Sequence, residues 1–242
     1  MRKLVIPVFL VVMLVATSAL AAPIVYSNTR PQPVGSSAET SLQTILDTIT
    51  GSPGSINAYS DQKNAGYWGL QNPAPGVIAP LLRFQFAGNS NEFGLWSGKD
   101  TNGPINTRAI FLGSATPTDF ALVQWLTSSS GVIFGGSGVA AGAFSGIPIN
   151  GFGFYISGQG GTFFSIDQLN GGYAQMLAYQ QAASNTWILA FEDLPRAGAD
   201  GDFNDKVVSV ESIVPVPEPG TMFLLGSGLV GLAGWGRKKF RK

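Results

Sequence analysis

The sequence contains no cysteine and no histidine among its 242 residues. Without cysteine the chain forms no disulfide and offers no thiolate as a nucleophile or a metal ligand. Without histidine it cannot build a Ser-His-Asp triad, a Cys-His pair or a common zinc site. Any metal ion that this chain binds must therefore be held by oxygen ligands, which favours calcium or magnesium.

Charged residues are also few, at 12% of the chain, and the net charge is zero. Seven of the fourteen Lys and Arg residues lie among the first three or the last six residues of the chain. Residues 22–216 therefore hold seven basic and thirteen acidic residues, a balance of −6. A nucleic-acid-binding surface needs clustered Lys and Arg to neutralise phosphates. This acidic balance argues against nucleic acid as a partner.

The N-terminal end has the organisation of a secretory signal peptide. Arg2 and Lys3 precede an apolar run, and Ala19 and Ala21 then match the small-x-small pattern of a cleavage site. We therefore expect residues 1–21 to be a signal peptide. Residues 22–35, rich in Pro and polar residues, are expected to be a loose leader.

The C-terminal end has a short apolar stretch, residues 221–236, which several glycines interrupt. It is shorter than the roughly twenty residues of a spanning helix. Five of the last six residues are basic, which keeps that end in the cytoplasm. The order of motif, apolar stretch and basic tail resembles the PEP-CTERM sorting signal, here in residues 215–242, with the motif Val216, Pro217, Glu218 and Pro219.

The resemblance to this sorting signal implies a partner and a location. It implies that an exosortase, a membrane protease-transpeptidase, removes the tail after a transient association with the inner membrane. The mature protein would then reach the cell surface or the extracellular matrix of a bacterium that makes extracellular polysaccharide. The alternative is that the short apolar helix remains as a permanent C-terminal anchor.

One short amphipathic helix is expected near the start of the main domain. Ser36 and Glu39 have the spacing of a capping box, and Gly51 ends the pattern. Apolar residues recur between them at the i, i+3, i+4, i+7 spacing that places a stripe on one helical face: Leu42, Ile45, Leu46 and Ile49.

Short aromatic or β-branched runs separated by Gly, Asn, Pro and Ser follow this helix. They predict an all-β fold, an antiparallel and jelly-roll-like β-sandwich that spans residues 36–214. The runs at residues 119–126 and 175–183 fit a strand or a short helix equally well. The expected strands are residues 81–86, 92–96, 107–113, 131–134, 151–157, 161–166, 186–191 and 206–213.

Five carboxylates fall within the fourteen residues 192–205, and Arg196 is the single cation among them. Carboxylates at such density repel one another unless a cation lies between them. Alternating oxygen ligands resemble the start of an EF-hand loop, but Asp205 stands where that loop needs Gly, and a strand pattern follows. We therefore predict a calcium loop between two strands, with the ligands Glu192, Asp193, Asp200, Asp202, Asn204 and Asp205.

The alternative for this loop is a solvated polar turn whose Asp side chains cap backbone N–H groups. The sequence FEDLPRAGADGDFNDKVVSV also resembles the closing signature of a bacterial family of domains of unknown function. Residues 91–96 and 152–165, with Asn170, fit the same family, so the resemblance covers about residues 85–213. The resemblance implies that this domain is of a kind that occurs in exported and surface proteins. The spacer at residues 195–197 departs from the family's Gly-rich pattern, and Arg196 there offers a competing partner for a carboxylate.

These observations predict a non-enzymatic exported protein with a structural calcium site. A carbohydrate-binding or adhesive module of the exopolysaccharide or biofilm matrix is the alternative, because aromatic residues can stack on sugars. A carboxylate-based glycan hydrolase is a more distant one, since its two acids must face each other across a cleft. The aromatic candidates, most of which a sandwich would use in its core, are Tyr67, Trp68, Trp96 and Trp125.

Overall fold

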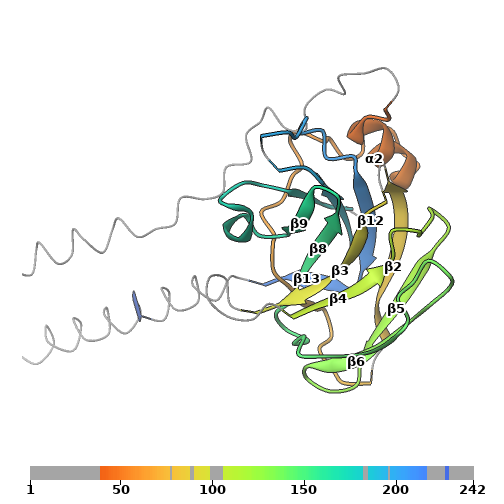
Figure 1. The fold of residues 1–242 in the computed structure, drawn as a ribbon, viewed down its shortest axis with the longest axis vertical. Coiled ribbons are helices and arrows are strands. Elements are labelled where there is room, and N and C mark those ends of the chain that lie inside the picture. The colour runs from red at the N-terminus through yellow and green to blue at the C-terminus, as the bar shows by residue number, and fades with distance from the viewer. Residues whose placement is uncertain are drawn as a thin grey trace, which may run out of the picture.

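The computed structural model describes residues 39–76, 78–87, 90–98, 106–181, 185–195, 197–216 and 227–228 (Figure 1). The expected signal peptide, the leader, Arg196, the motif residues 217–219 and nearly all of the C-terminal apolar stretch lie outside these residues. Among the described residues, no helix is long and apolar enough to cross a membrane.

Strands make up most of the described secondary structure, together with helix α2 (Leu42–Thr50) and the 3-10 turn η1 (Asp167–Asn170). The strands are β1 (Trp68–Leu70), β2 (Ile78–Ala87), β3 (Glu92–Ser97), β4 (Asn106–Phe111), β5 (Phe120–Trp125), β6 (Ser130–Gly135), β7 (Gly142–Ser145), β8 (Gly153–Gly158), β9 (Gly161–Phe164), β10 (Met176–Gln180), β11 (Thr186–Phe191), β12 (Lys206–Glu211) and β13 (Ile213–Pro215).

These strands form antiparallel sheets. A seven-stranded sheet has the order β10-β11-β12-β2-β5-β6-β7, a four-stranded sheet the order β4-β3-β8-β9, and β1 pairs with β13. The all-β prediction and its antiparallel pairing are therefore confirmed. The two runs that the sequence left open, residues 119–126 and 175–183, contain strands β5 and β10, and residues 182–183 lie outside the described residues.

The inner core lies between the seven-stranded and the four-stranded sheet. Alternate residues of β11, Leu189 and Phe191, belong to it together with Phe93 and Leu95 of β3. The rings of Phe93 and Phe191 meet edge to face, with centroids 6.0 Å apart. Alternation along a strand places every second side chain on one face, so this contact packs the two sheets against each other.

A second, outer core lies between helix α2 and the other face of β10, β11 and β12 (Figure 1). It contains Leu46 of the helix, Ile188 and Ala190 of β11, Val207 of β12 and Phe203 of the loop before β12. Strands β10 to β12 are thus buried on both faces, which explains why the run TWILAF is apolar without alternation.

Ser36 lies outside the described residues, but the capping box predicted for it is wrong, because Glu39, its expected third helical residue, is not in the helix. Ser41 caps the helix instead, its Oγ accepting a hydrogen bond of 3.3 Å from the Thr44 N–H, while Glu39 and Thr40 are not helical. The carbonyl of Thr40 accepts a hydrogen bond from the Asn204 side chain. This tertiary contact involves the residues just before Ser41, so the helix begins only after it. Its end at Gly51, with φ of 62°, is as predicted.

Candidate metal centre

The acidic loop joins two neighbouring strands of the seven-stranded sheet. Phe191, the last residue of β11, pairs with Lys206, the first residue of β12. Residues 192–205 therefore leave and re-enter the sheet at the same place, as the sequence predicted, and they lie at the end of the sheet that helix α2 covers (Figure 1).

Phe203 anchors the part of this loop that leads into β12. Its side chain is fully buried in the outer core, and its φ of 58° lies in the left-handed region, which is rare for a non-glycine residue. Gly201 also has a positive φ, of 75°. The burial of Phe203 thus holds an unfavourable backbone conformation, and the two residues beside it, Asp202 and Asn204, are buried.

Three carboxylates converge in this loop. One oxygen each of Glu192, Asp202 and Asp205 lies within 4.8 Å of the other two. Glu192 is 1% exposed, and its Oε2 accepts a hydrogen bond of 3.0 Å from the Gly201 N–H. Its Oε1 is buried and has no hydrogen-bond partner among the described residues. A buried carboxylate oxygen without a donor is costly, and a cation at the centre of the group would satisfy it.

Burial and mutual repulsion raise the pKa values of all three carboxyls. Loss of solvent is the largest cause that raises the pKa of Glu192 from 4.5 to about 8, and the charges of Asp205, Asp200 and Asp202 contribute to the same rise. Burial raises the pKa of Asp205 to about 7 and that of Asp202 to about 6. In a cation site that lacks its ion, the charged forms of the neighbouring acids are disfavoured in the same way.

A second group of acids adjoins the first through Asp202. One oxygen each of Glu39, Asp200 and Asp202 also lies within 4.8 Å of the others, and Glu39 and Asp200 are exposed. Asn204 braces this side, because its Nδ2 donates to Asp202 Oδ2 at 2.7 Å and to the Thr40 carbonyl at 3.1 Å. The loop is thereby tied to the chain that leads into α2, a contact that sequence spacing alone did not reveal.

Asp193 belongs to neither group of acids. Its Oδ2 accepts a hydrogen bond of 2.6 Å from Nδ2 of Asn91, and its N–H donates to Asp205 Oδ2 at 2.9 Å. Lys206 is fully buried beside it, and its Nζ donates to the main-chain carbonyl of Asn91. Burial lowers the pKa of Lys206 to about 8. Neither Asn91 nor Lys206 is among the site residues that the sequence predicts.

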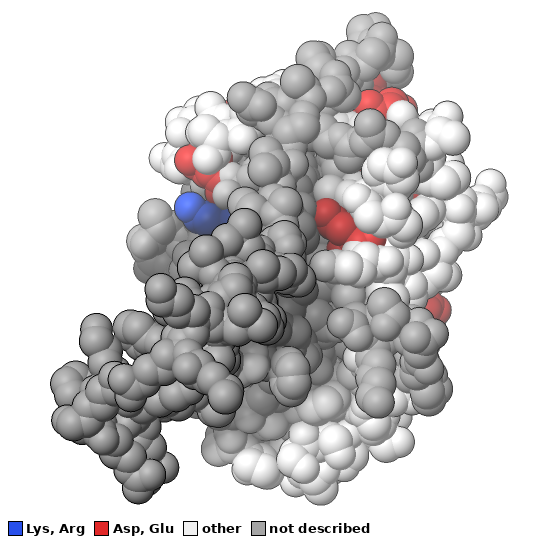
Figure 2. Space-filling model, turned by 90° about the vertical axis from the view of Figure 1, so that its left-hand side faces the viewer, with Lys and Arg blue, Asp and Glu red and all other residues white. Residues whose placement is uncertain are grey.

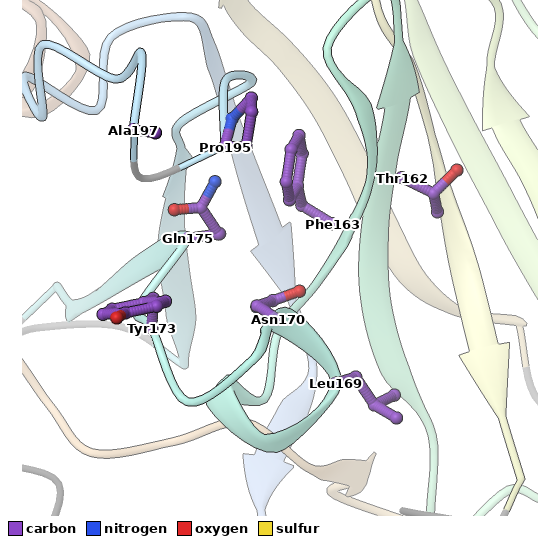
Figure 3. A pocket seen from close by; sticks show the side chains of 8 residues that line it. All are labelled: Thr162, Phe163, Leu169, Asn170, Tyr173, Gln175, Pro195 and Ala197. Carbon is purple, nitrogen blue, oxygen red and sulfur yellow. The ribbon is translucent and has the colours of Figure 1, made fainter.

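The surface near the loop carries a pocket of about 370 Å³ (Figure 3). Figure 3 shows Phe163 and Gln175 on its sides, Tyr173 at its rim, and Pro195 and Ala197 of the acidic loop above them. Tyr173 is 45% exposed. The four aromatic residues that the sequence suggested for sugar stacking are all buried: Tyr67, Trp68, Trp96 and Trp125.

The acidic side chains are dispersed on the face of the molecule that Figure 2 shows. On the face that Figure 2 shows, the described Asp and Glu side chains form separate small patches, with little basic surface beside them. Among the described residues of this face no continuous basic stripe is visible. The densest group of acids consists of Glu192 and Asp202, which are buried, and Asp205, which is half-buried.

Comparison with known protein families identifies two segments of the chain. Residues 215–238 match the PEP-CTERM protein-sorting motif. The chain carries a PEP-CTERM sorting signal. Residues 143–213 match the family described as Domain of unknown function (DUF4114). No curated protein and no solved structure matches the chain.

Both resemblances noted in the sequence are thus confirmed. The DUF4114 match includes the acidic loop and the glycine-rich hairpin before it, whereas residues 91–96 lie outside it. The PEP-CTERM motif implies processing by exosortase, a membrane protease, and fits an exported protein that is anchored in a membrane before the tail is cleaved.

Proposed function

We propose that this chain is an exported structural protein of the bacterial surface or extracellular matrix, a β-sandwich whose acidic loop binds one calcium ion. The observation that carries the calcium proposal is Glu192. Its side chain is 1% exposed, no donor among the described residues reaches one of its oxygens, and two further carboxylates lie within 4.8 Å. A calcium ion at this position would accept all three as ligands and remove their repulsion.

Calcium suits the group better than magnesium does. Calcium takes six to eight oxygen ligands in flexible geometry, whereas magnesium demands a tight octahedron and keeps several waters. The loop offers carboxylate oxygens of Glu192, Asp202 and Asp205, with Asp200 close by. The role would be structural, because the ion would join the end of β11, the start of β12 and the tip of the loop.

The burial of Glu192 and Asp202 also supports a non-enzymatic role. A glycosidase needs two carboxyls on opposite sides of a sugar, with a cleft between them. Glu192 and Asp202 are 1% and 2% exposed, so no substrate reaches between them. We therefore also propose that the acidic loop has no hydrolase activity.

A thermal melt tests the calcium site. Extracellular sites bind calcium with dissociation constants on the order of 0.1–1 mM. At about 10 mM calcium, ligand binding then contributes roughly 1.4–2.7 kcal/mol to the free energy of unfolding. We expect the melting temperature of the metal-free protein to rise by about 3–10 °C. Magnesium should raise it less.

Two matched variants complete this test. Glu192→Gln keeps the size of the side chain and an oxygen for the Gly201 N–H, but removes the charge, and should abolish the calcium shift. Asp119→Asn makes the same kind of change in the turn before β5, where Asp119 accepts from the Thr116 N–H, and should keep the shift. A metal-free wild type whose melting temperature does not respond to calcium would refute the calcium proposal.

The pocket beside the loop favours a second candidate function, carbohydrate binding in the matrix. An exposed aromatic ring at a rim, with amide groups near it, is a common arrangement for a sugar ring. Tyr173 supplies such a ring, and the Gln175 amide lies in the wall, where its Nε2 already donates to the Leu194 carbonyl. Pro195 and Ala197 of the acidic loop form another part of the wall (Figure 3). This function would coexist with the structural calcium site.

A further inference from the structure

A lysine, an asparagine and an aspartate meet in the interior beside the acidic loop. The amine of Lys206 donates to the main-chain carbonyl of Asn91, and the side-chain amide of Asn91 donates to Asp193 Oδ2 at 2.6 Å. All three residues are buried, and Lys206 is 0% exposed. The amine thus lies against the main chain of Asn91, and the carboxylate of Asp193 against its carboxamide, in the interior.

The strands explain why these side chains converge. Lys206 has the same parity along β12 as Val208 and Val210, both of which lie in the inner core. Asn91 precedes β3 and has the same parity as Phe93, which lies in the inner core as well. Since alternate residues share a face, Lys206 and Asn91 approach from the two opposing sheets at one end of that core.

The carboxamide of Asn91 also has little freedom. A Cβ added at Gly158 would lie 1.7 Å from Asn91 Oδ1, so the carboxamide oxygen occupies the space that a side chain there would fill. A Cβ at Gly160 would lie 2.0 Å from the main-chain oxygen of Asp193. These two glycines, at the turn between β8 and β9, let Asn91 and Asp193 pack closely against that hairpin.

We propose that Lys206 and Asn91 form an intramolecular isopeptide bond, with Asp193 as the catalytic residue. The amine of Lys206, which is 0% exposed and already contacts the main chain of Asn91, attacks Cγ of that residue in its uncharged form. Asp193, which already contacts the leaving nitrogen Nδ2, takes a proton from the attacking nitrogen and passes it to Nδ2. A C–N bond forms, the Cγ–Nδ2 bond breaks, and ammonia leaves. No oxidant, reductant or co-substrate is consumed.

The product would be a covalent tie between the two sheets. Lys206 begins β12 of the seven-stranded sheet, Asn91 precedes β3 of the four-stranded sheet, and 115 positions separate them in the sequence. A cross-link over such a long loop restricts the unfolded chain as a disulfide does. An exported chain without cysteine has no disulfide with which to obtain the same effect.

Mass spectrometry of the folded protein recovered from the producing cells tests the proposal. The intact mass should be lower than that of the same processed sequence by one ammonia, about 17 Da. Trypsin should not cleave after Lys206, and a branched peptide should join residues 84–99 to the segment that begins at residue 197. An unmodified mass, or a linear tryptic peptide that ends at Lys206, would overturn the proposal.

Three further results make the test specific. Lys206→Met should restore the full sequence mass. Asp193→Asn keeps a side chain that can hydrogen-bond Asn91 but removes the base, and should also yield uncross-linked protein. A cross-linked Asp193→Asn protein would refute the role of Asp193. A loss of ammonia confined to a linear peptide around Asn91 would indicate cyclisation of that asparagine and would also contradict the cross-link. The wild-type measurement decides the main claim even if a variant does not fold.

Discussion

At the scale of single residues, the buried charge of Glu192 is the most informative feature of this protein. A carboxyl in the interior is expected to be protonated unless hydrogen bonds or a cation stabilise its charge. Among the described residues, the Gly201 N–H donates to Oε2 of Glu192, and no hydrogen bond reaches its buried Oε1. The polar-turn alternative explains the hydrogen bond that Asp205 Oδ2 accepts from the Asp193 N–H. It does not explain why the carboxyl of Glu192 lies so close to those of Asp202 and Asp205.

The raised pKa values lead to a pH prediction for the metal-free protein. The pKa values of Glu192, Asp205 and Asp202 rise to about 8, 7 and 6 on folding, from 4.5 for Glu and 3.8 for Asp. Between the ordinary and the raised values the folded protein binds more protons than the unfolded chain does. Its free energy of unfolding should therefore fall as the pH rises from about 4 to about 8.

Calcium should reverse this trend, because it binds the ionised carboxylates and gains affinity as they lose protons. Melts of metal-free and calcium-loaded protein at several pH values between about 5 and 8 measure both effects. Glu192→Gln should flatten the metal-free curve and make that variant more stable than wild type near pH 8. A metal-free stability that rises with pH in this range would contradict the assignment of buried, repelling acids.

At the scale of elements, the loop depends on the helix that covers it. Phe203 packs in the outer core between α2 and the seven-stranded sheet, and its left-handed backbone carries the turn between Asp202 and Asn204. Removing a buried Phe side chain costs about 3–5 kcal/mol. We expect Phe203→Ala to lower the free energy of unfolding by that amount, whereas Phe120→Ala, at an exposed position of β5, should change it by less than about 0.5 kcal/mol.

A glycine at the same position separates packing from backbone strain. Alanine at a φ near 58° carries a left-handed penalty of about 1 kcal/mol, and glycine does not. Phe203→Gly should therefore be at least as stable as Phe203→Ala, although glycine is otherwise the more destabilising of the two. Urea unfolding of both variants measures the difference. A markedly less stable glycine variant would show that the backbone conformation is not strained.

A helix or strand could be predicted from the sequence where the interactions that determine it lie within its own segment. Turn residues and β-rich composition predicted most strands, because both signals lie within each segment. The run at residues 175–183 was ambiguous because β10 is buried on both faces and shows no alternation. The start of α2 was mispredicted because the residues before its cap are engaged in a contact from Asn204, 164 positions away.

The residues of the candidate site also fall into two groups, those close together in the sequence and those brought together only by the fold. Glu192, Asp202 and Asp205 were predicted together because a hairpin loop brings neighbours in sequence together in space. Glu39 and Asn91 approach the loop only through the packing of α2 and of the four-stranded sheet. Lys206 looked like the polar first residue of a strand, and only its burial reveals a site residue. Contacts over more than a hundred positions leave no periodic signal in a single sequence.

At the scale of the whole molecule, the β domain ends where the sorting signal begins. Strand β13 closes the fold at Pro215 by pairing with β1, and Val216 still donates its N–H to the Tyr67 carbonyl. The match to the PEP-CTERM motif begins at residue 215. Cleavage beyond Val216 would thus leave every described strand intact, so the domain can be released or transferred without unfolding.

This arrangement predicts the mass of the mature protein. If exosortase removes the tail, protein recovered from the surface or the medium should lack the six residues RKKFRK, and its C-terminus should lie after the motif Val216–Pro219. Replacing Pro217, Glu218 and Pro219 by alanine should leave the β domain folded, because these residues follow its last strand. The same change should block processing and retain the protein in the membrane fraction with its basic tail. Intact-mass measurement of both fractions distinguishes processing from permanent anchoring: surface protein that still ends in RKKFRK would show that the apolar segment is an anchor and that the motif does not direct cleavage.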